Sequence, residues 1–433
     1  MAREMKYSGI EWIGDIPAEW EMKRLKAIFL ERKEKNDPQK TDFILSLGAA
    51  YGVVPYSEKE GGGNKAKEDL TAYRLAYPDD IVMNSMNIIS GSVGISKYFG
   101  CVSPVYYMLY PRLEGVNQHY YCQTFQTKAF QRSLLGLGNG ILMKETESGN
   151  FNTVRMRIPM EKLGVQLLPF PKAEEQKRIA DFLEQKCAEI DTVIDKTKAT
   201  IEEYKKLKQS VVTEAITKGI YSNRVMKDSG IEWIGDIPAE WEIKTAFQLF
   251  AQVKNKNEGL VEKNLLSLSY GKIKRKSIDT IGGLLPESFD GYNIIEKDDI
   301  VLRLTDLQND HTSLRVGLAN ERGIVTSAYI TLRNRSKNTP LYLYYYLHTF
   351  DVVKGFYGMG AGVRQGLNWD GLKKLKIVTP PISEQEEITK FLEQKCAEID
   401  TIIEQKTHLL EEMESYKKSV IYEYVTGKKE VVL

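Results

Sequence analysis

Apolar residues recur at alternating steps of four and three along two long segments of the chain, with Glu and Lys around them. This spacing is the heptad pattern of a coiled coil, whose apolar positions form one continuous seam. The seam residues of the first segment are Leu183, Cys187, Ile190, Ile194, Ile201 and Tyr204. Those of the second segment are Leu392, Cys396, Ile399, Ile403, Leu410 and Met413. We expect two long helices that bury their seams against each other; the alternative is that each helix packs on its own domain.

Prolines mark the start of both expected helices. Pro171 and Pro380 end the preceding strands, and a Glu-Gln pair follows four residues later in each case. Ser383 and Glu386 have the spacing of a capping box at the start of the second helix. A first helix from Glu174 to Thr217 would be about 66 Å long at 1.5 Å per residue, a length on the order of 19 base pairs of DNA.

Shorter apolar patterns fill the chain before each long helix. In the first half, β-type runs at 42–47, 79–86 and 100–110 precede a helical pattern at 120–135. In the second half, β-type runs at 264–273, 298–307 and 323–333 precede a helical pattern at 341–356. Short strands followed by a helix indicate α+β domains with twisted, mixed or antiparallel sheets. We therefore divide the chain into two domains, 1–170 and 221–380, and two long helices, 171–220 and 381–433.

Two strings of the sequence occur twice. FLEQKCAEIDT covers 182–192 and 391–401, and SGIEWIGDIPAEWE covers 8–21 and 229–242. The period is far longer than the roughly 20–50 residues of a solenoid repeat, so the pattern indicates a duplicated domain with its connecting helix. The sequences between the repeated strings differ. The tryptophans of the second string are interpreted as anchors of the chain entry, with stacking on a nucleic-acid base as the alternative.

Charge is unevenly distributed along the chain. The whole chain has a net charge of +1, but residues 23–170 carry +5, residues 243–380 carry +7, and the remainder carries −11. The segments that differ between the two halves are therefore basic, and the repeated connectors are acidic. A local basic excess modestly favours a nucleic-acid ligand for the two domains.

The sequence offers no pattern typical of a catalytic, metal or phosphate site. The four cysteines lack CxxC spacing, and the four histidines, His119, His311, His348 and His408, lack ligand spacing. A G-x-x-x-x-G-K-[ST] phosphate loop and a G-x-G-x-x-G dinucleotide fingerprint are both missing. No apolar run approaches the ~18 residues that span a bilayer, and the N-terminal residues lack a signal core. We expect a cytoplasmic chain that is non-catalytic by itself.

These motifs together resemble the specificity subunit of type I restriction-modification enzymes, over essentially the whole chain. The resemblance lies in the order of the parts: a Trp-Pro string, a variable domain and a long helix opened by Glu-Gln-x-x-Ile, all present twice. It implies two target-recognition domains, each reading one half of an asymmetric bipartite DNA site, separated by an antiparallel coiled coil. It also implies two methyltransferase subunits and two restriction subunits as partners. S-adenosylmethionine, ATP and Mg²⁺ would then be bound by the partners and no cofactor by this chain.

Polar loop residues of the two domains are the candidates for DNA contact. Arg and Lys suit phosphate and guanine, and Asn and Gln suit adenine. In the first domain the candidates are Asn84, Ser85, Asn87, Ser92, Lys97 and Lys144. In the second domain they are Lys272, Lys274, Arg275, Lys276, Arg303, Gln308, Asn309, His311, Arg315, Arg364 and Gln365. For each one an ordinary solvated loop position is the alternative. The alternative function for the whole chain is a non-catalytic coiled-coil scaffold whose two domains bind protein partners.

Overall fold

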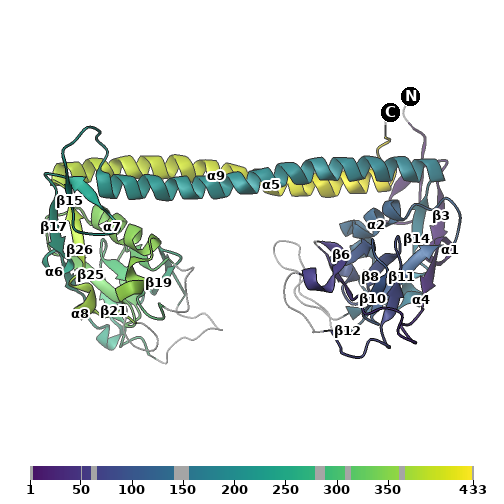
Figure 1. Ribbon diagram of the computed structural model, residues 1–433, viewed down its shortest axis with the longest axis horizontal. Coiled ribbons are helices and arrows are strands. Elements are labelled where there is room, and N and C mark those ends of the chain that lie inside the picture. The colour runs from purple at the N-terminus through teal and green to yellow at the C-terminus, as the bar shows by residue number, and fades with distance from the viewer. Residues whose placement is uncertain are drawn as a thin grey trace. The chain divides into compact units, whose positions relative to one another are not determined.

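A computed structural model describes residues 3–49, 51–59, 66–140, 156–277, 288–307, 314–359 and 366–431. The chain forms two compact units (Figure 1). Unit 1 contains Met1–Lys198 together with His408–Leu433, and unit 2 contains Ala199–Thr407. Each unit therefore combines one variable domain with part of both long helices.

The two long helices are α5 (Ala173–Lys218) and α9 (Ile382–Val425). Their bounds lie close to the ends predicted from the prolines. The capping box predicted at Ser383 is wrong, because α9 already begins at Ile382 and Ser383 lies inside its first turn. Among the described residues, no helix combines the length and the apolar character needed to cross a membrane.

Within each unit, α5 and α9 lie side by side and run antiparallel (Figure 1). In unit 1, the rings of Phe182 and Tyr424 are 4.5 Å apart, and Asp191 pairs with Lys417 further along. Moving forward on α5 therefore means moving backward on α9. Most seam residues are buried, and the partly buried ones are Cys187, Tyr204, Ile403, Leu410 and Met413. The predicted pair of antiparallel helices is confirmed, and the individual seam positions stay a prediction. Leu183 and Leu392 also join the cores of the adjacent domains.

The first domain is built on an antiparallel sheet with the strand order β4-β11-β8-β9. These strands are β4 (Phe29–Arg32), β11 (Tyr106–Pro111), β8 (Ile81–Asn84) and β9 (Val93–Ile95). Helices α2 (Gln118–Gln126) and α3 (Lys128–Ser133) replace the single helix predicted at 120–135. Tyr120, Tyr121 and Phe125 of α2 are fully buried in the core that this sheet and the start of α5 share.

The second domain repeats this arrangement with the strand order β18-β25-β22-β23. These strands are β18 (Phe250–Gln252), β25 (Ile330–Asn334), β22 (Ile300–Leu302) and β23 (Val316–Leu318). Helix α7 (Pro340–Val352) takes the place of α2 and buries Tyr342 and Tyr346. The α+β prediction is confirmed in both halves.

Smaller elements complete the domains. The remaining strands of unit 1 are β1 (Met5–Tyr7), β2 (Asp15–Pro17), β3 (Glu21–Arg24), β5 (Leu45–Gly48), β6 (Gly52–Pro55), β7 (Arg74–Ala76), β10 (Gly100–Val102), β12 (Asn139–Gly140), β13 (Met156–Arg157) and β14 (Leu167–Phe170). Those of unit 2 are β15 (Met226–Asp228), β16 (Asp236–Pro238), β17 (Glu242–Thr245), β19 (Leu266–Ser269), β20 (Lys272–Arg275), β21 (Asn293–Ile295), β24 (Gly323–Val325) and β26 (Lys376–Thr379). The short helices are α1 (Leu25–Ile28), α4 (Met160–Leu163), α6 (Ala246–Leu249) and α8 (Trp369–Leu372), and the 3-10 turns are η1 (Tyr56–Glu58), η2 (Ile88–Ser90), η3 (Glu258–Leu260) and η4 (Gly355–Met359).

A buried aspartate before the central strand shows how the two domains keep one framework with different residues. Asp80 and Asp299 occupy equivalent places before β8 and β22, and each accepts two hydrogen bonds from one arginine. In the first domain this arginine is Arg32 of β4, whereas in the second it is Arg333 of β25. The buried charge is compensated in both domains, by an arginine from the adjacent strand in the second and from the strand beyond it in the first.

Candidate nucleic-acid interface

The first-domain candidates gather where strand β8 ends. Asn84 is its last residue, and the following loop carries Ser85, Asn87 and Ser92 before β9 begins. Of these four, only Asn87 is exposed. The Asn84 side chain accepts a hydrogen bond from the Met86 backbone N–H, which shapes the loop from inside.

Three of these predicted contacts do not fit the structure. Asn84, Ser85 and Ser92 are buried, and the Ser85 hydroxyl donates to the Val105 carbonyl oxygen at 2.6 Å. A side chain enclosed in this way holds the loop and does not face a ligand. Asn87 stays a candidate for direct contact.

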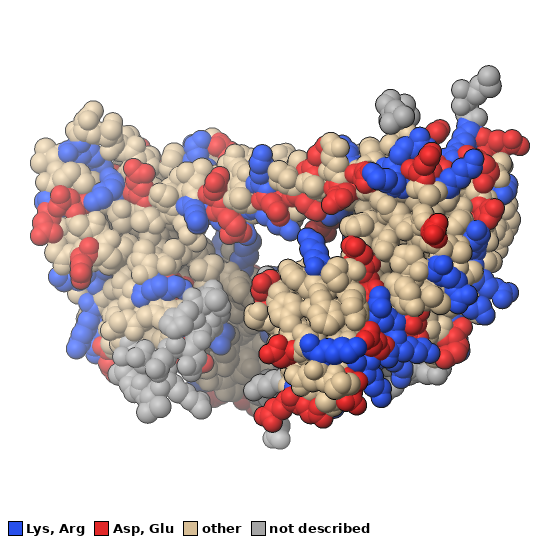
Figure 2. Space-filling view, turned by 45° about the vertical axis from the view of Figure 1, so that its right-hand side comes forward, with Lys and Arg blue, Asp and Glu red and all other residues tan. Residues whose placement is uncertain are grey.

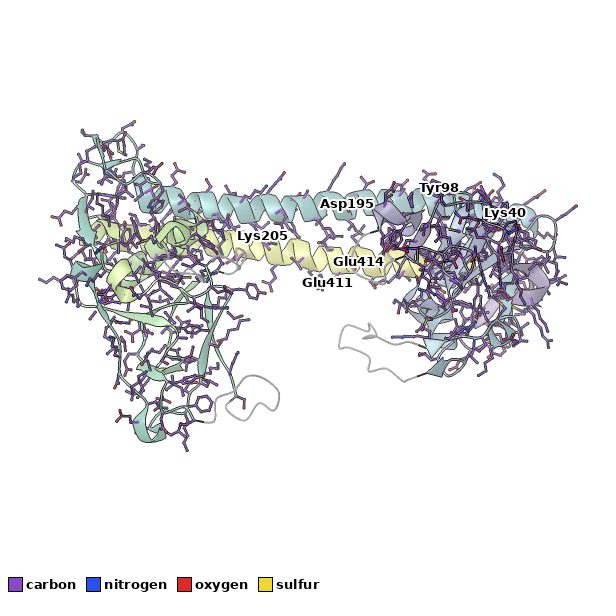
Figure 3. All side chains as sticks on the ribbon, turned by 60° about the horizontal axis from the view of Figure 1, so that its bottom comes forward. Lys40, Tyr98, Asp195, Lys205, Glu411 and Glu414 are labelled. Carbon is purple, nitrogen blue, oxygen red and sulfur yellow. The ribbon has the colours of Figure 1, made fainter. Side chains whose placement is uncertain are left out.

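An exposed aromatic residue accompanies Lys97 in the turn between β9 and β10. Tyr98, next to Lys97, lies at the surface of the first domain (Figure 3), with its ring 5.8 Å from that of Phe43. Phe43 and Phe99 are also exposed. This cluster was not predicted from the sequence, although the Lys-Tyr-Phe string at 97–99 is the kind of basic and aromatic interleaving that binds nucleic acid.

In the second domain, the basic run lies on strand β20. Lys272, Lys274 and Lys276 are exposed and make no ion pair with any residue that the structure describes. Arg275 differs, because its guanidinium is paired with the Glu321 carboxylate, with Nε 2.7 Å from Oε1. Glu321 therefore competes with a phosphate for Arg275, and the available cations are Lys272 and Lys274 on the strand and Lys276 directly after it.

Arg315 is wholly buried, so its predicted DNA contact does not fit the structure. Its guanidinium donates to the carbonyl oxygens of Arg303 and Thr305, at 3.1 and 2.8 Å, and its backbone N–H donates to Asp351. Arg315 thus ties the segment after β22 to helix α7. The side chain of Arg303 is half-buried at the start of this segment and stays a candidate.

Six further candidates lie outside the described residues. They are Lys144, Gln308, Asn309, His311, Arg364 and Gln365.

The repeated Trp-Pro string is a structural clamp. Trp20 is buried, and its indole N–H donates to Glu175 at the start of α5, whose other carboxylate oxygen lies 2.7 Å from Arg3. In unit 2, Trp241 donates in the same way to Glu384 of α9, which Arg224 also contacts. The anchoring interpretation is confirmed, and stacking of these two rings on a base is wrong.

The Gln of each Glu-Gln pair ties its long helix to the domain helix. Gln176 accepts from the Asn117 backbone N–H before α2 and donates to the Pro171 carbonyl oxygen. Gln385 accepts from the Thr339 N–H before α7 and donates to Pro380 in the same way. The duplication of this dipeptide signalled an important role, but the sequence alone did not identify its partners.

Thiol and metal chemistry find no support among the described residues. Burial raises the pKa of Cys101 to about 11 and that of Cys122 to about 12, so both stay protonated at neutral pH. No group of three or more His, Cys, Asp or Glu side chains in the described ranges is placed to hold a metal ion.

Charge on the long helices is mixed. On the face shown in Figure 2, basic and acidic side chains are interspersed along the band of the two helices. Acidic residues outnumber basic ones along α9. In unit 1, Asp195 of α5 and Glu411 and Glu414 of α9 are exposed (Figure 3).

Solved structures share this fold. A chain from a study of complex assembly and conformational transition of a type I R-M system superposes with a TM-score of 0.71 at 14% identity, covering 96% of this chain and 99% of that one. The HsdS subunit from Thermoanaerobacter tengcongensis superposes with a TM-score of 0.52 at 12% identity, covering 96% and 98%.

Sequence relatives match the chain over nearly its whole length or over part of it. A Methanocaldococcus jannaschii protein described as a type I restriction enzyme MjaX specificity subunit is 23% identical, covering 96% of this chain and 95% of its own. The type I restriction enzyme MjaVIII specificity subunit of the same organism is 25% identical over 60% of this chain and 61% of its own. The family model for the type I restriction modification DNA specificity domain matches residues 17–203 and 238–412. With most of its length matched, in two copies, the chain belongs to this family of type I restriction-modification DNA specificity domains.

Proposed function

We propose that the chain is the sequence-specific DNA-binding subunit of a type I restriction-modification complex, and that it recognises an asymmetric bipartite site. One observation supports this most directly: a single framework, including the Trp–Glu–Arg clamp, is built twice and carries two different loop surfaces. Two unlike surfaces on one repeated framework suit two unlike half-sites. The first domain, 1–170, would read one half-site and the second domain, 221–380, the other.

Contact with DNA would divide between phosphates and bases. Lys97, Lys272, Lys274 and Lys276 are exposed and suited to phosphate. Asn87 and Arg303, at equivalent strand ends of the two domains, are suited to base edges. Buried Ser85 and Arg315 would position these loops without touching DNA.

The long helices would hold the partner subunits. Outside the seam, the long helices carry exposed apolar residues: Val193, Leu409 and Tyr416 in unit 1, and Leu207 in unit 2, where Ile402 is half-buried. Val193 corresponds to Ile402 in the internal repeat, and Leu207 corresponds to Tyr416. Two equivalent apolar pairs, Val193 with Tyr416 and Ile402 with Leu207, suit two copies of one partner. We assign this partner as two methyltransferase subunits, with two restriction subunits bound through them.

No catalytic step is assigned to this chain. S-adenosylmethionine, ATP and Mg²⁺ would bind to the partner subunits, and the complex would act with the DNA in the cytoplasm. The role of this chain is to choose the site and to bring the partners to it.

The test is binding and modification by the chain co-purified with its methyltransferase partners. The complex should retard a duplex carrying its bipartite site far more than an unrelated duplex, with strong salt dependence. Replacing residues 243–380 with the corresponding segment of another family member should change one half-site only, as read from the positions of modified adenines. Equal retention of all duplexes, or a change in both half-sites, would contradict the proposal.

The alternative function is a non-catalytic scaffold whose two domains bind proteins. The exposed lysines of β20 favour DNA over this alternative, because Lys272 and Lys274 stand on one face and pair with no acidic side chain among the described residues. A chain that still assembles with protein partners through both domains, but binds no duplex, would support the scaffold.

A further inference from the structure

The hairpin formed by β19 and β20 differs from its counterpart in the first domain in one specific way. Both hairpins have one face against the core. The opposite face carries exposed residues in the second domain, whereas in the first domain Ser46 on that face is buried. In the second domain, Leu268 and its cross-strand partner Ile273 make the inner face. Cross-strand pairs lie on one face, so Ser267 with Lys274, and Ser269 with Lys272, make the outer face.

The corresponding outer face of the first domain carries no charge. There the hairpin of β5 and β6 pairs Ser46 with Val54 and Gly48 with Gly52. Its tip residue Tyr51 folds back onto the hairpin, since a Cβ added to Gly48 would lie 2.3 Å from the Tyr51 ring. The outer face of the first hairpin is therefore uncharged, and its tyrosine packs against Gly48 of the same hairpin.

Tyr270, at the tip of the second hairpin, is 76% exposed. Its φ is +48° and that of Gly271 is +74°, so both central residues of this two-residue turn are left-handed, as in a type I′ turn. Asn, Asp or Gly is favoured at the first position, and a bulky aromatic residue there is strained. The turn would form more readily without tyrosine, so local folding does not account for Tyr270.

Shape and chemistry point to one ligand. Among the strands that the structure describes, β20 pairs only with β19, so the hairpin is a two-stranded ribbon, which the major groove of DNA can admit. Lys272 and Lys274 stand two strand positions apart, about 6.7 Å, on the same face as two serine hydroxyls. Ammonium and hydroxyl groups are the side-chain donors that proteins use toward phosphates.

We propose that the β19–β20 hairpin is a groove-binding ribbon of the second domain alone. Lys272 and Lys274 bind backbone phosphates on one wall of the groove, and the Tyr270 ring makes an apolar contact with a base edge at its floor. This inference rests on the proposed function and adds an asymmetry to it: the second half-site is held by a cationic ribbon that the first half-site lacks.

The test uses the complex of the full chain with its methyltransferase partners, on a duplex carrying the site mapped from its modified adenines. For Lys272→Ala with Lys274→Ala, the slope of log affinity against log salt should fall by about 1.8, equally on specific and non-specific DNA. A control for the loss of a lysine elsewhere is Lys337→Ala, an exposed lysine between β25 and α7, which should leave the slope unchanged.

Tyr270→Asn separates binding from folding. Asn-Gly is a preferred type I′ pair, so this variant should melt at the same temperature as the parent chain or higher. It should nevertheless bind the specific duplex about tenfold more weakly and tolerate a changed base pair at one position of the second half-site.

Three outcomes would overturn the inference. They are an unchanged salt slope in the lysine variant, unchanged affinity in Tyr270→Asn, and loss of the methyltransferase partners from the variants, which would make the hairpin a protein contact. If the parent complex itself prefers no duplex, the proposed function fails. If the parent is specific and the variants match it, only the hairpin inference fails.

Discussion

Lys208 of α5 places its ammonium nitrogen 2.6 Å from a carboxylate oxygen of Asp400 on α9. The corresponding residues of the repeat make the same contact in unit 1, where Lys417 lies 2.6 Å from Asp191. In the repeat, Lys208 corresponds to Lys417 and Asp400 corresponds to Asp191, so each ion pair is the counterpart of the other. Contacts in a symmetric dimer are related in the same way. Opposite charges at these places favour the antiparallel register seen in each unit.

Reversing one of these charges should destabilise unit 2. In Lys208→Glu, a carboxylate faces Asp400, and we expect a loss of about 1 kcal/mol in the free energy of unfolding, because both groups are partly exposed. Adding Asp400→Lys restores an opposite pair and should recover most of that loss. Urea unfolding followed by circular dichroism measures both variants. A double variant no more stable than the worse single one would show that the pair does not contribute.

The Glu384 carboxylate, which accepts from the Trp241 indole, should contribute more to the free energy of unfolding than any surface ion pair. Glu384→Ala leaves the buried indole N–H and the Arg224 guanidinium without this acceptor, and we expect a cost of about 2–4 kcal/mol. Glu384→Gln keeps one oxygen acceptor and should cost clearly less. Chemical denaturation followed by tryptophan fluorescence distinguishes the two. Equal stability of the Ala and Gln variants would contradict the hydrogen-bond explanation.

Gly427, after the end of α9, is a position where only glycine fits. Its φ is +72°, and an added Cβ would lie 2.4 Å from Cδ of Pro17. Gly427→Ala should therefore cost about 2 kcal/mol or more through backbone strain and overlap. The matched control is Gly9→Ala, where φ is +78° but no atom lies within 4 Å of the added Cβ, so the cost should be about 1 kcal/mol. Equal melting temperatures of the two variants would contradict the packing argument.

Acid should destabilise unit 2 through His348. Burial, with a smaller contribution from Lys208, lowers the pKa of this imidazole to about 4. The unfolded chain binds the proton at a pKa near 6.5, so the stabilisation is complete above that pH and is lost as pH falls from about 6.5 to about 4. The loss over this window should be at most about 3 kcal/mol. His348→Phe, measured by urea unfolding at several pH values, should flatten the stability profile there. An unchanged profile would assign the acid sensitivity to other groups.

If the helix pair sets the gap between half-sites, lengthening both helices should lengthen the gap. One heptad inserted after Lys198 in α5 and one after Thr407 in α9 keep the seams in phase and add about 10 Å, or about 3 base pairs. Mapping modified adenines before and after the change measures the gap. The control exchanges the heptad that ends at Lys198 and the heptad that ends at Thr407 for the inserted sequence, so that the helix lengths do not change. An unaltered gap in the lengthened chain would refute the spacing role.

The sequence predicted what depends on periodicity and repetition. The seam at Leu183 and Ile190 follows from apolar spacing, and the α+β order from short runs ended by Gly and Pro. The strand order β4-β11-β8-β9 was not predicted, because local patterns do not specify which strands pair. The sequence also did not predict which arginine binds the buried aspartate, because this arginine comes from a different strand in each domain.

The loop candidates show why polar residues are hard to interpret from sequence. Arg315 and Lys274 both belong to polar runs, yet one is fully buried under backbone carbonyls and the other is exposed. Burial of a charged residue depends on whether the fold supplies enough acceptors around it. Some of those acceptors come from residues distant in sequence, such as the Tyr357 hydroxyl, 3.3 Å from Nε of Arg315, which local patterns do not reveal.

The division into units has a consequence for the order of events during synthesis. Unit 2 is one continuous stretch, Ala199–Thr407, whereas unit 1 needs the segment from His408 onward, which brings Val420 and Val425 into its core. Unit 1 therefore cannot complete its hydrophobic core until unit 2 and the segment after it have been translated. In the nascent chain the N-terminal domain is the more exposed to chaperones and proteases, and a truncation before His408 would affect it while leaving the later-made unit entire.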